Sequence, residues 1–346
     1  MSDTLSAISP RDKRAQQQVD ALLIQEGIQR DGNLDYTCGL FDDDWNLAAT
    51  GSCFANTIRC LAVDGSRQGE GLLNQIVSHL MEVQVQRGNS HVFLYTKPQA
   101  TRFFADLGFY EIARVEGSLV FMENRRSGFS DYRAALAKTR RDGDAAAIVM
   151  NANPFTLGHL HLVERAAAEN ETIHLFVLSE EAGPIPFAVR RKLVREGVAH
   201  LSNVVCHDSG PYIISSATFP SYFLKDGDTV IRTHAALDIQ VFGAIAECLN
   251  IRRRYVGEEP TSRVTGLYNE VMARRLPELG IDCRIIPRLE REGRAISASD
   301  FRQAVHDGAL ERALELLPEA GQRYFTSPEA AAVIAAIQAA EHVVHY

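Results

Sequence analysis

The sequence lacks three features, and each absence argues against a class of protein. Its six cysteines form no C-x-x-C pair, which argues against a zinc site or a disulfide framework. It has no apolar run long enough to span a bilayer and no apolar signal-peptide core near its start. Its 36 basic and 44 acidic residues give a net charge of −8, which argues against a nucleic-acid surface. We therefore expect free buried thiols and a cytoplasmic protein with no nucleic-acid or membrane partner.

The length and composition of the chain fit two globular domains. It has 346 residues, and 46% of them are hydrophobic, enough for two sizeable cores. No internal repeat is visible. A charge-rich stretch at residues 125–144 predicts the linker between the domains, with its charges on a solvated face.

A stretch near the middle of the chain organises the second half. Residues 145–150 form an apolar run typical of a buried parallel strand, and residues 159–168 repeat apolar side chains at helical spacing. Between them, Pro154 fixes φ and forces a turn, while Gly158 lacks a Cβ and lets the backbone approach a ligand. The free N–H groups of the helix start would point back at this turn. A strand, a tight turn and a helix start predict an anion site, most often for phosphate.

Hydrogen-bond donors crowd the same turn. Thr156, His159 and His161 lie in or beside the first helical turn, where their side chains would donate to phosphate oxygens. The alternative is an ordinary strand–helix unit whose histidines face solvent. The pattern Asn-Pro-x-Thr-x-Gly-His, starting at Asn153, resembles a signature of the nucleotidyltransferase superfamily. Members of that superfamily transfer the AMP part of ATP while pyrophosphate leaves.

The resemblance implies roles for the residues of this turn. His159 would donate to the α-phosphate as the catalytic residue, with Thr156 and His161 bracing the adjacent oxygens. The rest of the turn would contact the nucleotide, and it comprises Asn153, Pro154, Phe155 and Gly158.

A second motif lies 140 residues further along the chain. Residues 296–302 read Ile-Ser-x-Ser-x-x-Arg, which matches the second signature of the same superfamily. Ser297 is a good N-cap for the helix that follows, and a capping serine alone would mean nothing. The resemblance implies that Ser297, Ser299 and Arg302 hold the β- and γ-phosphates.

Two more positions are candidates for nucleotide contact. Arg190 follows a Pro-Phe pair at the place where related enzymes carry a cation that reaches the phosphates; surface charge on a helix is the alternative. Gly257 ends a predicted strand, again at a carboxyl end where ligands bind in parallel sheets. We also predict a short strand at residues 230–233 and a semi-buried, pocket-lining loop at residues 211–225.

The first half of the chain has a different pattern. Strands at residues 36–41, 47–50 and 57–63 lead to a glycine-rich turn and an amphipathic helix at residues 72–87. A strand, a helix and a hairpin follow. This order resembles the GNAT acyltransferase fold, in which such a turn holds the pyrophosphate of coenzyme A. Gly69 and Gly71 keep the turn, whereas Phe104 stands where a tyrosine usually donates a proton. We therefore expect binding without transfer chemistry, and a purely structural domain is the alternative.

The fold class is therefore α/β. We predict a GNAT-like α+β domain at residues 1–135. A Rossmann-like, doubly wound parallel-sheet nucleotidyltransferase domain with C-terminal helices follows at residues 143–346.

Nearly the whole chain, from about Gln18 to about Leu317, resembles the citrate lyase ligase family. The segments that carry this resemblance are NANPFTLGHLHLVE, YIISSATFPSYFLK, RTHAALD, VGEEPTSRVTGLYNEVM and EGRAISAS. The resemblance implies that acetate and ATP, bound with Mg²⁺, give acetyl-adenylate and pyrophosphate. The acetyl group then passes to the thiol of the CoA-derived group on the acyl-carrier (γ) subunit of citrate lyase, and AMP is released.

Two other functions stay open from the residues alone. One is another adenylyltransferase, such as those of coenzyme A or NAD synthesis, in which a phosphate is the nucleophile. The other is a non-catalytic module that binds acyl-CoA or an acyl carrier through the GNAT-like half.

Overall fold

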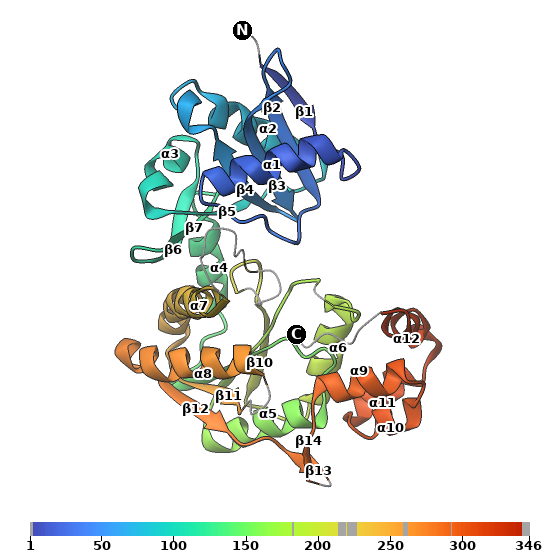
Figure 1. The fold of residues 1–346 in the computed structure, drawn as a ribbon. Helices are drawn as coiled ribbons and strands as arrows, with labels where there is room; N and C mark the ends of the chain where they lie inside the picture. Colours follow the sequence, from blue (N-terminus) through green and yellow to red (C-terminus); the bar gives the residue numbers. More distant parts are fainter. Residues whose placement is uncertain are drawn as a thin grey trace. The chain divides into compact units, whose positions relative to one another are not determined.

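A computed structural model describes residues 3–181, 183–213, 219, 227–258, 262–291 and 293–340. The chain forms two compact units, one up to Asp131 and one from Tyr132 onward, with residues 227–233 grouped with the first. Figure 1 shows the ribbon of both units. Within the described ranges, no helix is long and apolar enough to cross a membrane.

The first unit is built on one seven-stranded sheet. In pairing order its strands are β1 (Thr4–Ala7), β2 (Tyr36–Phe41), β3 (Leu47–Phe54), β4 (Thr57–Val63), β5 (Phe93–Thr96), β7 (Leu119–Glu123) and β6 (Tyr110–Val115). All neighbours are antiparallel except β4 and β5, which pair in parallel over two residues of each strand. This order, with a long helix between the two parallel strands, is the GNAT-like fold that the sequence predicted.

Helices cover both faces of this sheet. They are α1 (Lys13–Gln25), α2 (Leu72–Gln86) and α3 (Thr101–Asp106), with short 3₁₀ turns at Gly65–Arg67 and Pro98–Ala100. The buried side chains of α1 and α2 belong to two separate hydrophobic clusters. Helix α4 (Gly128–Ala137) spans the division between the units.

The glycine-rich turn at the start of α2 requires glycine for its backbone. Gly69 has φ of +90° and Gly71 has φ of +77°, in the left-handed region that other residues rarely adopt. Among the described residues, no heavy atom other than those of the chain neighbours lies within 4 Å of where a Cβ would stand on either glycine. The start of α2 is therefore open on this side.

The second unit contains a five-stranded parallel sheet. In spatial order the strands are β10 (Val204–Asp208), β9 (Ile173–Val177), β8 (Ala145–Met150), β11 (Ile251–Gly257) and β12 (Asp282–Ile286). The chain starts in the centre at β8, adds β9 and β10 on one side, and then crosses to β11 and β12 on the other. The predicted doubly wound sheet is confirmed, and its switch point lies between β8 and β11.

Helices and a small hairpin complete the second unit. The helices are α5 (Leu157–Glu169), α6 (Phe187–Gly197), α7 (Gly227–Leu249), α8 (Arg263–Arg275), α9 (Ala298–His306), α10 (Leu310–Leu314), α11 (Glu319–Phe325) and α12 (Ala331–Gln338). Pro277–Leu279 and Pro328–Ala330 are 3₁₀ turns, and β13 (Glu290–Arg291) pairs with β14 (Arg294–Ala295).

The strand predicted at residues 230–233 is wrong, because these residues lie in α7. Val230, Ile231 and Thr233 favour strands locally. The helix nevertheless forms because the apolar side chains that follow, from Ala235 to Leu249, recur at helical spacing and are buried. Most of the loop predicted at residues 211–225 lies outside the described residues.

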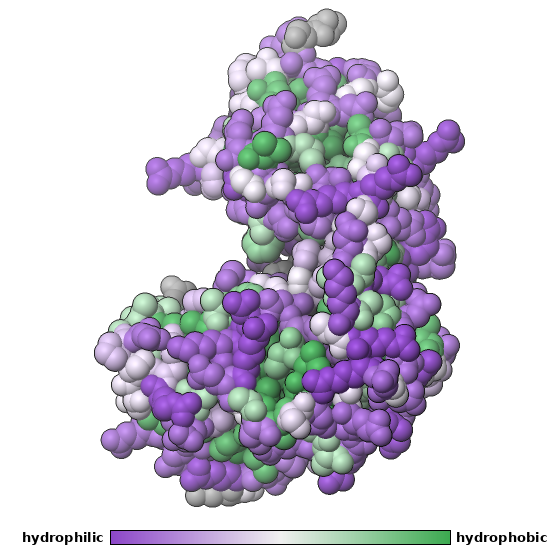
Figure 2. Space-filling model, turned by 180° about the vertical axis from the view of Figure 1, so that it is seen from behind, coloured by the Kyte–Doolittle hydropathy of each residue, from purple (hydrophilic) through white to green (hydrophobic). Residues whose placement is uncertain are grey.

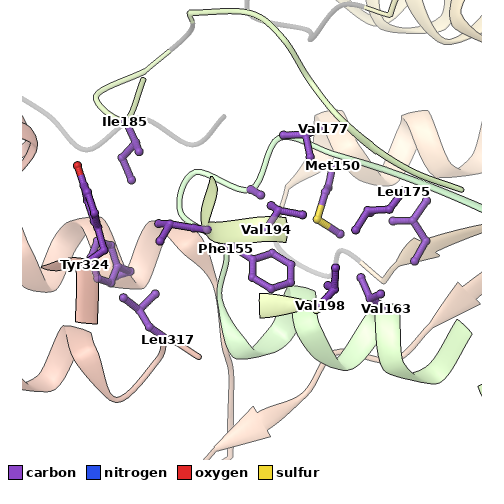
Figure 3. Close-up of a cluster of buried hydrophobic side chains, with 14 of the residues drawn as sticks. Met150, Phe155, Val163, Leu175, Val177, Ile185, Val194, Val198, Leu317 and Tyr324 are labelled. Carbon is purple, nitrogen blue, oxygen red and sulfur yellow. The ribbon is translucent and has the colours of Figure 1, made fainter. Parts of the chain in front are cut away.

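The core of the second unit lies between the sheet and the helices α5, α6, α9, α11 and α12. Figure 3 shows Phe155 among Met150, Val163, Val194 and Val198 in this cluster. The surface in Figure 2 is mostly hydrophilic, with apolar side chains gathered in small patches on both units.

All six cysteines are free, as expected, but only Cys38, Cys53 and Cys60 are buried, while the other three are partly exposed. Burial raises the pKa of every one of these thiols. The shift is largest in the first unit, where the pKa of Cys38 is about 12 and those of Cys53 and Cys60 are about 11. The cause is desolvation, which disfavours the thiolate.

Candidate phosphate-binding site

Thr156 and His159 cap the start of α5 reciprocally. The Thr156 hydroxyl accepts the His159 backbone N–H at 3.4 Å, and the His159 Nδ1 accepts the Thr156 backbone N–H at 3.1 Å. The Thr156 Oγ1 also lies 2.9 Å from the same Nδ1. A threonine followed by histidine three residues later therefore fixes the imidazole as well as the helix start.

These contacts determine which nitrogen of His159 carries the proton. Because Nδ1 accepts a backbone N–H, the neutral ring holds its hydrogen on Nε2. Burial is the largest cause that lowers the pKa of His159, and together with the charges of Arg288 and Arg302 it brings this pKa to about 4. The ring is neutral near pH 7 and presents Nε2–H as a hydrogen-bond donor.

The helix start is less open than the sequence suggested. The Leu157 N–H donates to the Leu316 carbonyl at 2.9 Å, and the His159 N–H is taken by Thr156. The expectation of free N–H groups is wrong for these two residues. The reason is that the segment after α10 lies against the start of α5, a contact between residues 159 positions apart.

Gly158 joins the two sequence motifs. A Cβ on Gly158 would lie 2.8 Å from the carbonyl oxygen of Ile296, closer than real contacts allow. We expected this glycine to let a ligand approach the backbone. The structure shows a second reason for glycine here, the close approach of the Ile296 carbonyl, and the contact of Gly158 with a ligand stays a prediction.

The side chains of the second motif form two hydrogen-bonded pairs. Ser297 caps α9, as expected: its Oγ accepts the Asp300 N–H at 3.0 Å and donates to the Asp300 carboxylate at 2.6 Å. Ser299 Oγ accepts from Arg302 Nη2 at 3.1 Å, and Arg302 Nη1 donates to the Asn153 carbonyl. Arg302 therefore ties the helix of the second motif to the turn of the first.

The remaining residues of the turn are buried and support the start of α5 from the core side. Asn153, Pro154 and Phe155 are buried, and the Asn153–Pro154 peptide is cis. The Phe155 ring lies in the core, with its centroid 5.9 Å from that of His159. The Phe155 side chain thus stabilises the imidazole from the core side, and only its main chain remains for a ligand.

Arg190 is fully buried, which was not expected for a surface or phosphate-binding arginine. Its Nη1 donates to the Asn151 carbonyl, the Asn151 Oδ1 and the Leu178 carbonyl at 2.8, 2.9 and 2.9 Å. Its Nε and Nη2 donate to the carbonyls of Ile185 and Glu180. The guanidinium thus ties together the ends of β8 and β9, and its contact with phosphate stays a prediction.

The two other predicted residues differ in their surroundings. Gly257 is the last residue of β11, the strand that pairs with β8, and among the described residues no heavy atom other than those of its chain neighbours lies within 4 Å of where its Cβ would stand. His161 is half-buried and two residues beyond His159, about 200° around the helix. Residues at that spacing do not share a face, so the roles of both histidines at one phosphate stay a prediction.

Sequence reasoning missed Arg288. Its Nε donates to the Glu258 carbonyl at 2.7 Å, which places the side chain across the carboxyl ends of β11 and β12. Its charge acts on His159. The available signal was a basic residue just after the last strand, but several arginines follow that strand and spacing did not distinguish them.

A neutral imidazole donor, two guanidinium groups and a hydroxyl thus gather near the switch point of a doubly wound parallel sheet. This combination suits phosphate groups, and the sheet that carries it defines an α/β domain of the doubly wound class.

Comparisons with known proteins agree with this class. Residues 145–325 match the family model of the citrate lyase ligase C-terminal domain. The [citrate [pro-3S]-lyase] ligase of Klebsiella pneumoniae is 35% identical over 314 residues, 89% of this chain and 92% of that protein. The protein of the same name from Escherichia coli K12 is 34% identical over 327 residues, 92% of this chain and 93% of that protein. The chain belongs to the citrate lyase ligase family.

Solved structures resemble about a third of the chain. A GNAT-family acetyltransferase from Staphylococcus aureus is 11% identical with a TM-score of 0.30, covering 35% of this chain and 98% of that one. Escherichia coli ElaA is 15% identical with a TM-score of 0.31, covering 36% and 99%. The strand order of the first unit, with its single parallel pair β4–β5, defines its GNAT-like fold.

Proposed function

We propose that this protein is an ATP-dependent, cytoplasmic [citrate (pro-3S)-lyase] ligase. It would activate acetate as acetyl-adenylate and transfer the acetyl group to the thiol on the acyl-carrier (γ) subunit of citrate lyase. The observation that carries the proposal is His159, which is held as a neutral Nε2–H donor near two guanidinium groups in a chain of this family. The relatives named above support the choice of substrate and partner.

In the first step, an acetate oxygen attacks the α-phosphorus of ATP, and the bond to the bridging oxygen breaks as pyrophosphate leaves. Acetate is already a nucleophile, so no general base is required. The work of the protein is alignment and charge stabilisation. His159 would donate to the α-phosphate through Nε2, while Ser299 and Arg302 would hold the leaving pyrophosphate.

Mg²⁺ fits this site only together with ATP. The donors present are an imidazole N–H, guanidinium groups and a hydroxyl, which suit phosphate oxygens rather than a cation. The ATP phosphates would therefore hold the ion, which would neutralise part of the charge on the leaving pyrophosphate.

In the second step, the carrier thiol attacks the acetyl carbonyl carbon. The bond to the AMP oxygen breaks, AMP leaves, and the thiol proton passes to solvent. The GNAT-like unit would dock the CoA-derived arm through the turn at Gly69 and Gly71, whose outer side is open.

ATP–pyrophosphate exchange with and without acetate tests the proposal. We expect exchange that requires acetate, and carrier acetylation with release of AMP when the carrier is added. His159→Ala should lower kcat by about 10²–10³-fold, the usual loss for one preorganised donor. Acetate-dependent exchange at the parental rate in folded His159→Ala would overturn the assignment of His159.

One match favours a second candidate. A phosphopantetheine adenylyltransferase of Staphylococcus haemolyticus is 36% identical over 75 residues, 21% of this chain and 44% of that protein. If the nucleophile were a phosphate, AMP would be retained in the product through a new pyrophosphate linkage. Free AMP, formed only in the presence of carrier and acetate, would exclude this alternative.

A further inference from the structure

Asn151 follows β8 directly and has a fixed side-chain orientation. Its carbonyl oxygen and its Oδ1 both accept hydrogen bonds from Nη1 of Arg190, at 2.8 and 2.9 Å. A guanidinium only donates, so the oxygen of the amide must face it. The Nδ2 group, with its two N–H donors, therefore points away from Arg190, and Asn151 is half-exposed.

The backbone after Asn151 is strained and held on both sides. Ala152 is buried with φ of +52°, in the left-handed region that alanine rarely adopts. Arg190 from α6 binds the carbonyl of Asn151, and Arg302 from α9 binds the carbonyl of Asn153. Strain that is over-determined in this way points to a functional role for the residues it orients.

Asn151 also lies at the edge of the sheet where a ligand is expected to bind. It lies at the carboxyl end of β8, the strand that pairs with β11, where doubly wound sheets bind their ligands. The cap of Thr156 and His159 belongs to the same turn.

The geometry points to Asn151 as a binding residue for the carboxylate of the acyl substrate, with Arg190 as its positioning residue. This inference rests on the proposed function. A neutral amide suits the nucleophile because a cation would reduce the nucleophilicity of the carboxylate. The amide N–H groups hold one oxygen and leave the other aligned on the α-phosphorus. The guanidinium groups of Arg288 and Arg302 remain for the phosphates.

Asn151→Asp tests this role with little change of shape. The variant keeps an oxygen for Arg190 but presents a second oxygen, in place of N–H groups, to the substrate. We expect the KM for acetate in ATP–pyrophosphate exchange to rise about 100-fold or more. The Kd for ATP, measured without acetate, should change less than threefold. Asn151→Ala should raise the KM for acetate about tenfold, the loss of one hydrogen bond to a charged group.

Two controls make the result specific. Gln17→Glu adds the same charge at an exposed position of α1 and should leave both constants unchanged. Asn151→Ser keeps a donor and should restore part of the acetate affinity relative to Asn151→Ala. This pair decides the question if the Asp variant does not fold, as judged by its thermal unfolding.

Two results would overturn the inference: a parental KM for acetate in folded Asn151→Asp and Asn151→Ala, or an ATP Kd that rises as much as the KM for acetate. The second result would indicate that Asn151 binds the phosphates of ATP. Failure of the proposed function looks different, because the parental enzyme would then show no acetate-dependent exchange.

Discussion

Arg190 is a cation buried among oxygen atoms of the main chain. Five hydrogen bonds join its guanidinium to Asn151, Leu178, Glu180 and Ile185, and its side chain has no exposed surface. A lysine could not replace this planar fork of donors. A single side chain thus fixes the ends of two strands at the edge where the substrates would meet.

We expect Arg190→Met to lower the free energy of unfolding by about 3 kcal/mol, because several buried oxygens would lose their donor. Urea unfolding followed by circular dichroism measures this. The control is Arg191→Met on the same helix. Arg191 is half-exposed and pairs with Asp208 at 3.0 Å, so its loss should cost less than about 1 kcal/mol.

The variant Arg190→Lys tests whether Arg190 orients Asn151 or only stabilises the fold. If Arg190 orients Asn151, the KM for acetate should rise in folded Arg190→Lys while the Kd for ATP stays near its parental value. Unchanged stability together with weaker ATP binding would instead support the contact between Arg190 and phosphate that the sequence predicted.

At the scale of elements, the start of α5 depends on the segment that leads into α9. Gly158→Ala would place a Cβ 2.8 Å from the Ile296 carbonyl, and backbone cannot move aside as a flexible side chain can. We expect a lower thermal midpoint and a loss of adenylation. Gly32→Ala is the control, because open space surrounds that position. Equal midpoints for both variants would mean that the motifs are not packed as described.

Strands β9 and β10 carry a buried histidine pair with a consequence for pH. His174 Nδ1 lies 2.8 Å from His207 Nε2. Burial, with a smaller effect of Arg141, lowers the pKa of His174 to about 4. Burial, with smaller effects of His174 and then Arg195, lowers the pKa of His207 to about 3. Below the ordinary pKa of about 6.5, the unfolded chain takes up protons that the native state does not bind.

Stability should therefore fall as the pH drops from about 6.5 toward 4. Thermal midpoints at pH 7.5 and pH 5 measure the loss. The double variant His174→Leu/His207→Phe should show a smaller difference between the two pH values, although His159 would retain part of it. The same pH difference in parent and variant would show that the pair does not titrate as described.

The sequence was informative where a signal is local. The strands β2, β4 and β8 match their predicted bounds, since each is a short apolar run between turn residues. The N-cap role of Ser297 was predicted because capping depends on a few consecutive residues. The contact between Gly158 and Ile296 and the burial of Arg190 were not predicted, because both depend on distant parts of the chain meeting in the fold.

At the scale of the whole molecule, the two half-reactions would divide between the two units. Gly69→Val places a branched side chain at φ of +90° beside the start of α2 and would block approach to the backbone. We expect slower acetyl transfer to the carrier and unchanged acetate-dependent ATP–pyrophosphate exchange, with the two steps assayed separately.

Gly117→Val is the matched control for that variant. Gly117 lies in the β6–β7 turn of the same unit, has φ of +72° and is also surrounded by open space. It carries the same backbone strain without touching the start of α2. If the two variants acetylate the carrier equally well, the first unit is a scaffold rather than a docking site.

The raised pKa values of the six thiols bear on chemical selectivity. An acetyl-adenylate acylates any thiolate that reaches it, and an enzyme that makes one risks modifying itself. A thiol whose pKa is raised is almost wholly protonated at neutral pH and reacts slowly. After many turnovers with carrier, intact-mass spectrometry should find the acetyl group on the carrier and none on the cysteines of this chain. The burial of its own sulfur atoms would thus leave the carrier thiol without a competitor.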